Sequence, residues 1–151
     1  MKALLTNPIL IYSGVAWACA QGIKIFIHYL RTHELDWHLL VETGGMPSSH
    51  AAYVCSAATA IAFHDGLDSS LFAMAVVVSI IIMVDAAGLR RAAGNQATIL
   101  NHIIEELFQG HPISEEKLKE LLGHTPTQVF FGAILGVLCP LIGMLWIWDG
   151  A

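Results

Sequence analysis

The sequence contains four apolar segments separated by short polar or turn-forming stretches, and these segments limit the folds open to the chain. Two of them, 8–30 and 129–148, are long enough to cross a hydrocarbon layer of about 30 Å as helices, at about 1.5 Å of rise per residue. The other two are 48–63, which is rich in small residues, and 71–84, which continues at least to Leu89. A single strand cannot satisfy its backbone polar groups in lipid, so each segment is predicted to be a helix.

The amino-acid composition favours a membrane protein over a soluble one. Hydrophobic residues make up 56% of the 151 residues and charged residues 13%, whereas roughly 25% are charged in a typical soluble domain. The mean hydropathy is +0.64. A net charge of −5 argues against nucleic acid as a partner, because binding its phosphates needs a basic face. We therefore predict one all-α domain over residues 1–151, an integral membrane helical bundle of about four transmembrane helices, surrounded by membrane lipid and compatible with a homo-oligomer.

Two further helices are predicted outside the spanning segments. Residues 92–108 are amphipathic, with Ile99 and Ile103 recurring at helical spacing, and this pattern favours a helix that lies in the membrane interface. Residues 114–122 are predicted to form a short water-facing helix that Ser114 caps.

Counting the crossings brings the polar ends of the spanning helices to one membrane face. The first helix ends there near Arg31, and the second begins there at Ser48. The third ends there near Arg90, and the last begins there at His124. We call this face the histidine side, and the opposite face, which holds both chain termini, the terminal side. The histidine side carries most of the lysine and arginine residues, namely Arg31, Arg90, Arg91, Lys117 and Lys119 against Lys2 on the terminal side. By the positive-inside rule, we predict a multi-pass protein of the cell membrane whose site faces the cytoplasm.

The segment 44–50, Gly-Gly-Met-Pro-Ser-Ser-His, is the first candidate for a site. Ser48 and Ser49 fall at the start of a predicted helix, where the first N–H groups have no partner within the helix and the dipole is positive. Such an end binds anions readily, and His50 beside it can donate or accept a proton near neutral pH. An ordinary serine cap with a bystander histidine is the alternative.

His124 is the second candidate, in the segment Leu-Gly-His-Thr-Pro-Thr-Gln. Pro126 fits the first turn of the last helix, so His124 also lies at a helix N-terminus. An imidazole near that positive end tends to be neutral and therefore nucleophilic. A capping-region histidine on a surface turn is the alternative.

The third candidate is a group of cations. Lys24 lies within the first spanning segment, and Arg31 follows seven residues later on the same helix face. A lysine in lipid is costly unless it reaches the interface or meets an anion or a carboxylate. Asp85, near the end of the third segment, precedes Arg90 and Arg91. A structural pair that ties the helices together, of Asp85 with Lys24 or with an arginine, is the alternative.

These motifs together resemble the type 2 phosphatidic acid phosphatase superfamily, which is shared with bacterial acid phosphatases and vanadium haloperoxidases. The resemblance is closest to the superfamily's divergent membrane branch. The segment Pro-Ser-Ser-His at 47–50 is similar to the family's Pro-Ser-Gly-His motif, and the spacing over 24–31 matches its first motif with Thr32 in place of a proline. His124 after a glycine resembles the histidine of the third motif.

The resemblance implies a role for each matching residue. His124 would attack phosphorus and form a phosphohistidine, and His50 would protonate the departing alkoxide. Lys24, Ser48 and the N–H groups near Ser49 would hold the phosphoryl oxygens. The activity implied is a lipid phosphatase without metal or cofactor, acting on a phosphomonoester or pyrophosphate whose apolar tail lies in the bilayer. The remaining histidines have no ligand-like spacing, so no metal site is expected: His28, His33, His38, His64, His102 and His111.

Two positions depart from the family's third motif. Leu118 stands where the family has an arginine, so Arg90 or Arg91 would supply that charge. Gln128 stands where the family has an aspartate, and Asp85 is a candidate to replace that carboxylate. The alternative function that Gln128 favours is a non-catalytic protein that uses the same cluster to bind an anionic headgroup or to transport a small anion.

Overall fold

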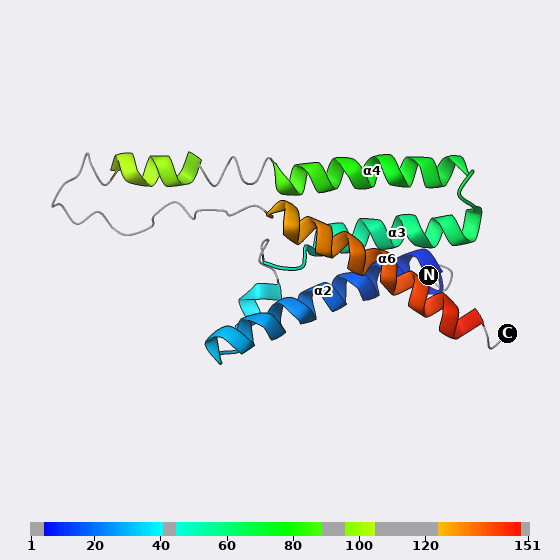
Figure 1. Cartoon of the computed structure of the whole chain (residues 1–151), viewed down its shortest axis with the longest axis horizontal. Helices are drawn as coiled ribbons and strands as arrows, with labels where there is room; N and C mark the ends of the chain where they lie inside the picture. The colour runs from blue at the N-terminus through cyan, green and yellow to red at the C-terminus, as the bar shows by residue number, and fades with distance from the viewer. Residues whose placement is uncertain (1–4, 41–44, 89–95, 105–123, 149–151) are drawn as a thin grey trace.

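The fold is a bundle of helices. The computed structural model describes residues 5–40, 45–88, 96–104 and 124–148. Its main elements are the helices α2 (Pro8–Thr32), α3 (Ser49–Asp65), α4 (Ser70–Ala87) and α6 (Pro126–Trp148), with the short 3-10 helix η1 (Trp37–Leu40) (Figure 1). The described residues contain no strand. The predicted all-helical class is therefore confirmed, and α2, α3, α4 and α6 each fall on one of the four apolar segments.

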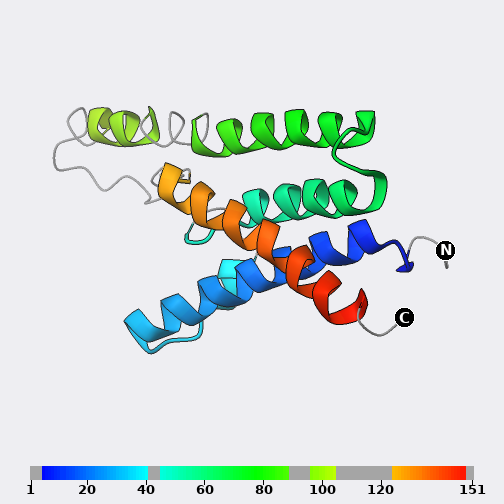
Figure 2. The same ribbon diagram turned by 45° about the vertical axis from the view of Figure 1, so that its right-hand side comes forward.

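Successive helices run in opposite directions. Both views show α2 and α4 ending at one end of the bundle, where α3 and α6 begin, while α2 begins and α6 ends at the other end (Figures 1 and 2). The alternating helix directions that the crossing count requires are thus present, and the ends of four helices are brought to the histidine side.

The lengths of the helices suit a membrane. Three of them, α2, α4 and α6, are long and apolar enough to cross one. The fourth, α3, has 17 residues, about 26 Å at the usual helical rise, and it packs against all three others. Together they form the integral membrane helical bundle that the composition predicts.

The interior of this bundle consists of small residues, while large apolar side chains point outward. Ala16, Ala20 and Ala52 form a fully buried cluster, whereas Ile81 and Val84 on α4 are exposed. A water-soluble protein places such side chains inside. In lipid the outward position costs nothing, and small interior residues let helix backbones approach closely.

The closest helix contact joins α3 to α6 through two glycines one turn apart. A Cβ added at Gly132 would collide with the carbonyl oxygen of Ser48, and one at Gly136 would collide with that of Ala52 and lie 2.9 Å from Cβ of Cys55. This spacing is typical of tightly packed transmembrane helix pairs. Because Gly132 faces Ser48, the contact also sets the start of α6 against the start of α3.

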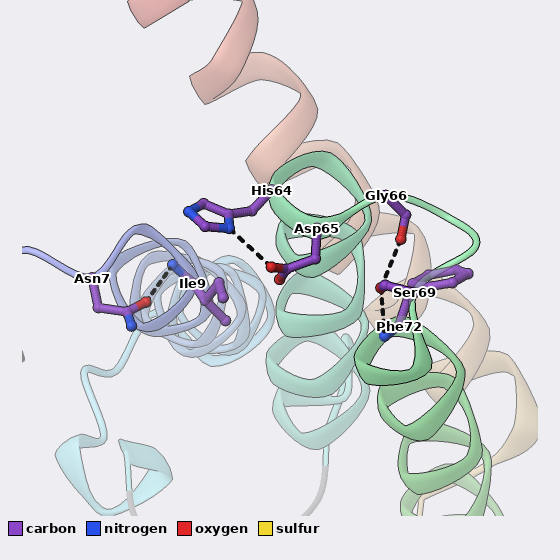
Figure 3. Close-up of polar contacts among 7 residues, drawn as sticks. All are labelled: Asn7, Ile9, His64, Asp65, Gly66, Ser69 and Phe72. Carbon is purple, nitrogen blue, oxygen red and sulfur yellow. Dashed lines mark hydrogen bonds and ion pairs between the residues drawn. The ribbon is translucent and has the colours of Figure 1, made fainter.

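Side-chain caps fix the helix ends on the terminal side. The Oδ1 atom of Asn7 accepts a hydrogen bond of 2.9 Å from the N–H of Ile9 at the start of α2 (Figure 3). Between α3 and α4, the hydroxyl of Ser69 accepts from the N–H of Phe72 at 3.1 Å and donates to the carbonyl of Gly66 at 2.8 Å. Gly66 has φ of 90°, which glycine adopts without strain. The tight turn between these helices is closed by these bonds.

The two helices predicted outside the spans have different outcomes. Residues 96–104, within the predicted 92–108, form a helix that continues in the direction of α4 beyond the bundle (Figures 1 and 2). Ile99 and Ile103 are exposed on it, and its place in the membrane interface stays a prediction. The helix predicted over 114–122 lies outside the described residues.

A glycine pair tests the packing of α3 against α6. We expect Gly136→Ala to lower the free energy of unfolding by about 1–3 kcal/mol, because its Cβ would displace backbone of α3. Gly14→Ala on α2 is the matched control, since its Cβ would meet no atom within 4 Å. It should leave stability unchanged or raise it by about 0.5–1 kcal/mol through helix propensity. Denaturation in detergent micelles, followed by circular dichroism, measures both. Equal effects of the two substitutions would contradict the close contact.

Candidate functional site

Two backbone hydrogen bonds join three helix ends on the histidine side. The N–H of Ser48, before α3, donates to the carbonyl of Gln128 in the first turn of α6 at 2.9 Å. The N–H of His124, before α6, donates to the carbonyl of Ala86 at the end of α4 at 3.1 Å. Segments that are far apart in the sequence are therefore held together by main-chain atoms.

The imidazoles of His50 and His124 meet at this junction. Their ring centroids are 5.7 Å apart and their planes are inclined by 67°, an edge-to-face arrangement. His124 is 1% exposed, and His50 is half-buried. The two rings come from different helices and lie at the same end of the bundle, as the crossing count predicts. They are too close for a phosphoryl group to lie between their faces, so a phosphate would contact their edges.

The side chain of Gln128 determines which nitrogen of His124 carries the hydrogen. Its Oε1 atom accepts a hydrogen bond from the N–H of Thr125 at 3.0 Å and lies 3.2 Å from Nδ1 of His124. A backbone N–H can only donate, so the amide atom that faces it is the oxygen, and that oxygen can only accept. Nδ1 therefore carries the hydrogen. In the neutral ring, the lone pair available for attack is then on Nε2.

The same glutamine is half of a capping box at the start of α6. The hydroxyl of Thr125 accepts from the N–H of Gln128 at 3.3 Å, while the amide of Gln128 accepts from the N–H of Thr125. This reciprocal pair is the known arrangement for a threonine followed three residues later by glutamine. Gln128 thus fixes the helix start and the ring of His124 together, but its amide brings no charge to stabilise an imidazolium.

The start of α3 provides the features of an anion site. Ser48 is fully buried, and its hydroxyl accepts a hydrogen bond from the N–H of Ala51 at 3.3 Å, so the predicted cap is present. Ser49 is also buried. The N–H groups of Ser49 and His50 are the first two of the helix, where no carbonyl of the same helix can accept from them. The ring of His50, beside this helix start, contacts that of His124.

Lys24 lies buried against the loop that leads into α3. Only 4% of the residue is exposed. Gly45, with φ of 77°, packs on the lysine stem, since a Cβ added there would lie 2.9 Å from Cγ and 3.0 Å from Cδ of Lys24. The loop therefore needs glycine at this position, both for its backbone conformation and for the space that the lysine occupies. The predicted cation is thus placed against Gly45, which lies three residues before Ser48 in the sequence.

Gln21 is a residue of this region that the sequence analysis missed. It is 5% exposed, one helical turn before Lys24, and its Nε2 atom donates to the carbonyl of Leu40 at 2.9 Å. Its Oε1 atom is also buried and accepts no hydrogen bond from the residues the structure describes. The signal that could have found it is an amide on the same face as the lysine, within a segment that spans lipid.

The other predicted site residues lie apart or outside the described ranges. Arg31 is exposed in the last turn of α2, and Asp85 is exposed near the end of α4. Neither side chain pairs with another described residue, so the Asp85–Lys24 tie is not formed, and Gln128 is the partner of His124 Nδ1. Arg90 and Arg91 lie outside the described residues, and their roles stay predictions. Within the described ranges, no three His, Cys, Asp or Glu side chains are grouped to hold a metal ion.

The fold and the site define an integral membrane helical protein in which two histidines meet where helix ends converge. The family model described as "Divergent PAP2 family" matches residues 5–139, and the chain belongs to this family. A relative, "Uncharacterized membrane protein YuiD" of Bacillus subtilis (strain 168), is 43% identical over 150 residues, which cover 92% of this chain and 95% of that protein. No solved structure matches the chain. The resemblance inferred from the motifs is therefore confirmed at the level of the family.

Substitutions in the capping box test the assignment of the His124 tautomer. We expect Gln128→Ala to lower the stability of the protein by about 1 kcal/mol and to release Nδ1, so that the ring populates both tautomers. Thr125→Ala, the matched control, should lower the stability of the protein by a similar amount. It should leave Nδ1 protonated, because the Gln128 oxygen keeps its contact with the ring. Nitrogen chemical shifts of labelled histidine distinguish the two forms. A wild-type protein with the hydrogen on Nε2 would contradict the assignment.

Proposed function

We propose that this chain is a membrane phosphatase that hydrolyses a lipid phosphomonoester or pyrophosphate through a phosphohistidine. The observation that carries the proposal is the contact of His50 with His124, whose Nδ1 is held by Gln128. Membership of the Divergent PAP2 family supports a phosphatase-related fold.

The proposed reaction has two steps. Nε2 of His124 attacks phosphorus, and the bond from phosphorus to the bridging oxygen breaks. His50 gives its proton to the leaving group, which is an alkoxide from a phosphomonoester or a phosphate from a pyrophosphate. His50, now neutral, then takes a proton from water, which attacks the phosphohistidine and releases phosphate and the free His124 ring. Both steps need the two rings close to one phosphoryl group, as the edge-to-face pair allows.

The phosphoryl oxygens would be held by cations and by the start of α3. The donors proposed for this role are the ammonium group of Lys24, whose stem packs on Gly45, the hydroxyls of Ser48 and Ser49, and the first amides of α3. Such donors stabilise the charge that develops in the transition state without reorganising. Arg90 and Arg91 would add the charge that Leu118 does not supply.

Replacement of the family's aspartate by Gln128 weakens the site without removing its chemistry. In serine proteases, an amide in place of the triad aspartate costs about 10⁴ in rate because it selects the wrong tautomer. Here the amide oxygen faces Nδ1, so the tautomer suits attack by Nε2. What is lost is the charge that would stabilise an imidazolium, and we expect a slow enzyme rather than an inactive one.

A lipid substrate suits the position of the site. We expect the helix ends that carry it to lie at the boundary between the apolar part of the bundle and water, where a headgroup phosphate lies. Its apolar tail would remain in the bilayer beside the outward-facing side chains. From the distribution of lysine and arginine, this boundary would be the cytoplasmic face of the cell membrane.

A second candidate function is binding an anionic headgroup or moving a small anion without hydrolysis. The neutral amide of Gln128 favours it, because an anion can be bound without stabilising an imidazolium. Counterflow of phosphate in liposomes would identify a transporter.

Release of phosphate by the purified protein tests the proposal. In detergent, wild type should release phosphate from phosphatidic acid or polyprenyl diphosphate. His124→Ala should abolish the reaction, because the nucleophile is absent, and His50→Ala should slow it by about 10²–10⁴. His64→Ala is the matched control, since that exposed histidine lies on the terminal side beside Asp65. Equal rates for wild type and His124→Ala would exclude catalysis by this site.

A further inference from the structure

Helix α2 extends beyond the level at which the other three helices end. Lys24 lies against Gly45, just before α3, while the starts of α3 and α6 and the end of α4 are joined there by main-chain hydrogen bonds. The eight further residues of α2, 25–32, extend about 12 Å past this level at the usual helical rise. Figures 1 and 2 show this part of α2, with η1 beside it, apart from the other helices.

The chain then folds back along the projecting part of α2. His33, with φ of 57°, caps the helix, and its N–H donates to the carbonyl of Tyr29 at 2.8 Å. The helix η1 begins four residues after His33, and the carbonyl of its last residue, Leu40, accepts from the side chain of Gln21 at 2.9 Å. We call residues 25–40 the α2 overhang. It consists of the projecting end of α2 and the segment that folds back along it, and the bond from Gln21 to Leu40 holds that segment against α2.

The overhang presents apolar and aromatic side chains on its surface, although the sequence of its second half looks polar. Trp37 is 65% exposed. The other exposed apolar residues are Phe26, Tyr29, Leu30, Leu35 and Leu40. Exposed polar residues accompany them, among them Arg31, His33 and Glu34. A surface of this composition in water would be unusual for so short a segment.

We propose that the α2 overhang lies in the interfacial layer of the bilayer, with Trp37 and Tyr29 at headgroup level beside the candidate site. Its surface continues along α2, where Val15 and Ile23 are exposed on the same face of the helix as Phe26. Tryptophan and tyrosine concentrate at membrane interfaces, because their rings have an apolar body and a polar edge. Arg31 and Glu34 would then face water. The partner of this surface is thus the boundary between headgroups and acyl chains, and the overhang is an anchor at that boundary.

The two tryptophans of α2 and η1 allow the proposal to be tested in lipid vesicles. The chain has four tryptophans, so two variants each keep one: Trp37 alone, and Trp17 alone as the matched control. Trp17 lies seven residues before Lys24, about 10 Å deeper along α2. We expect lipids brominated near the headgroup to quench Trp37 most, and lipids brominated near the chain end to quench Trp17 most. Aqueous acrylamide should quench Trp37 only weakly.

Three results would overturn the proposal. Strong quenching of Trp37 by acrylamide without quenching by brominated lipid would place the overhang in water. Protection from both quenchers would mean that protein, such as a second copy of the chain, covers it. A depth of Trp37 equal to that of Trp17 would place the overhang in the hydrocarbon. If the triple variants fail to fold by circular dichroism, 5-fluorotryptophan in the wild-type chain gives the same comparison, from relaxation by nitroxide lipids and by aqueous gadolinium. The test is independent of phosphatase activity.

Discussion

The main-chain bonds Ser48 N–H to Gln128 carbonyl and His124 N–H to Ala86 carbonyl are the constraint on which the site depends. Each joins the end of one helix to another helix, so the positions of both imidazoles follow from the backbone and not from flexible surface side chains. The close approach of Gly132 to Ser48 brings α6 near enough for the first bond. A bundle with a small-residue interior can place helix ends this close, whereas large interior side chains would hold them apart.

Gln128 couples the orientation of the His124 ring to the start of α6. Its amide oxygen accepts from Thr125 and faces His124 Nδ1, so the ring is oriented as a carboxylate would orient it. Gln128 differs from a carboxylate in its amide nitrogen and in its lack of charge. Since the same side chain also caps α6, replacing it affects helix stability and histidine chemistry together. This coupling is a physical reason for a polar residue with an acceptor oxygen at this position.

Much of the fold could be predicted from the sequence, because lipid allows so few backbone structures. The four apolar segments became α2, α3, α4 and α6, and counting their crossings was sufficient to bring His50 and His124 to one end. The hydrogen-bond partner of Gln21 and the return of residues 33–40 along α2 could not be predicted. Each depends on a contact between segments distant in the sequence, such as the bond from Gln21 to Leu40, which no local pattern encodes.

The central claim is that the two imidazoles, Lys24 and the start of α3 surround one phosphate. An experimental structure of the protein with vanadate tests it most directly, because vanadate adopts the geometry of a phosphoryl group under attack. We predict vanadium bonded to Nε2 of His124, with its oxygens near His50, Lys24 and the first amides of α3. Vanadate bound through other residues, or excluded from a junction in which the two rings keep their present contact, would contradict the account.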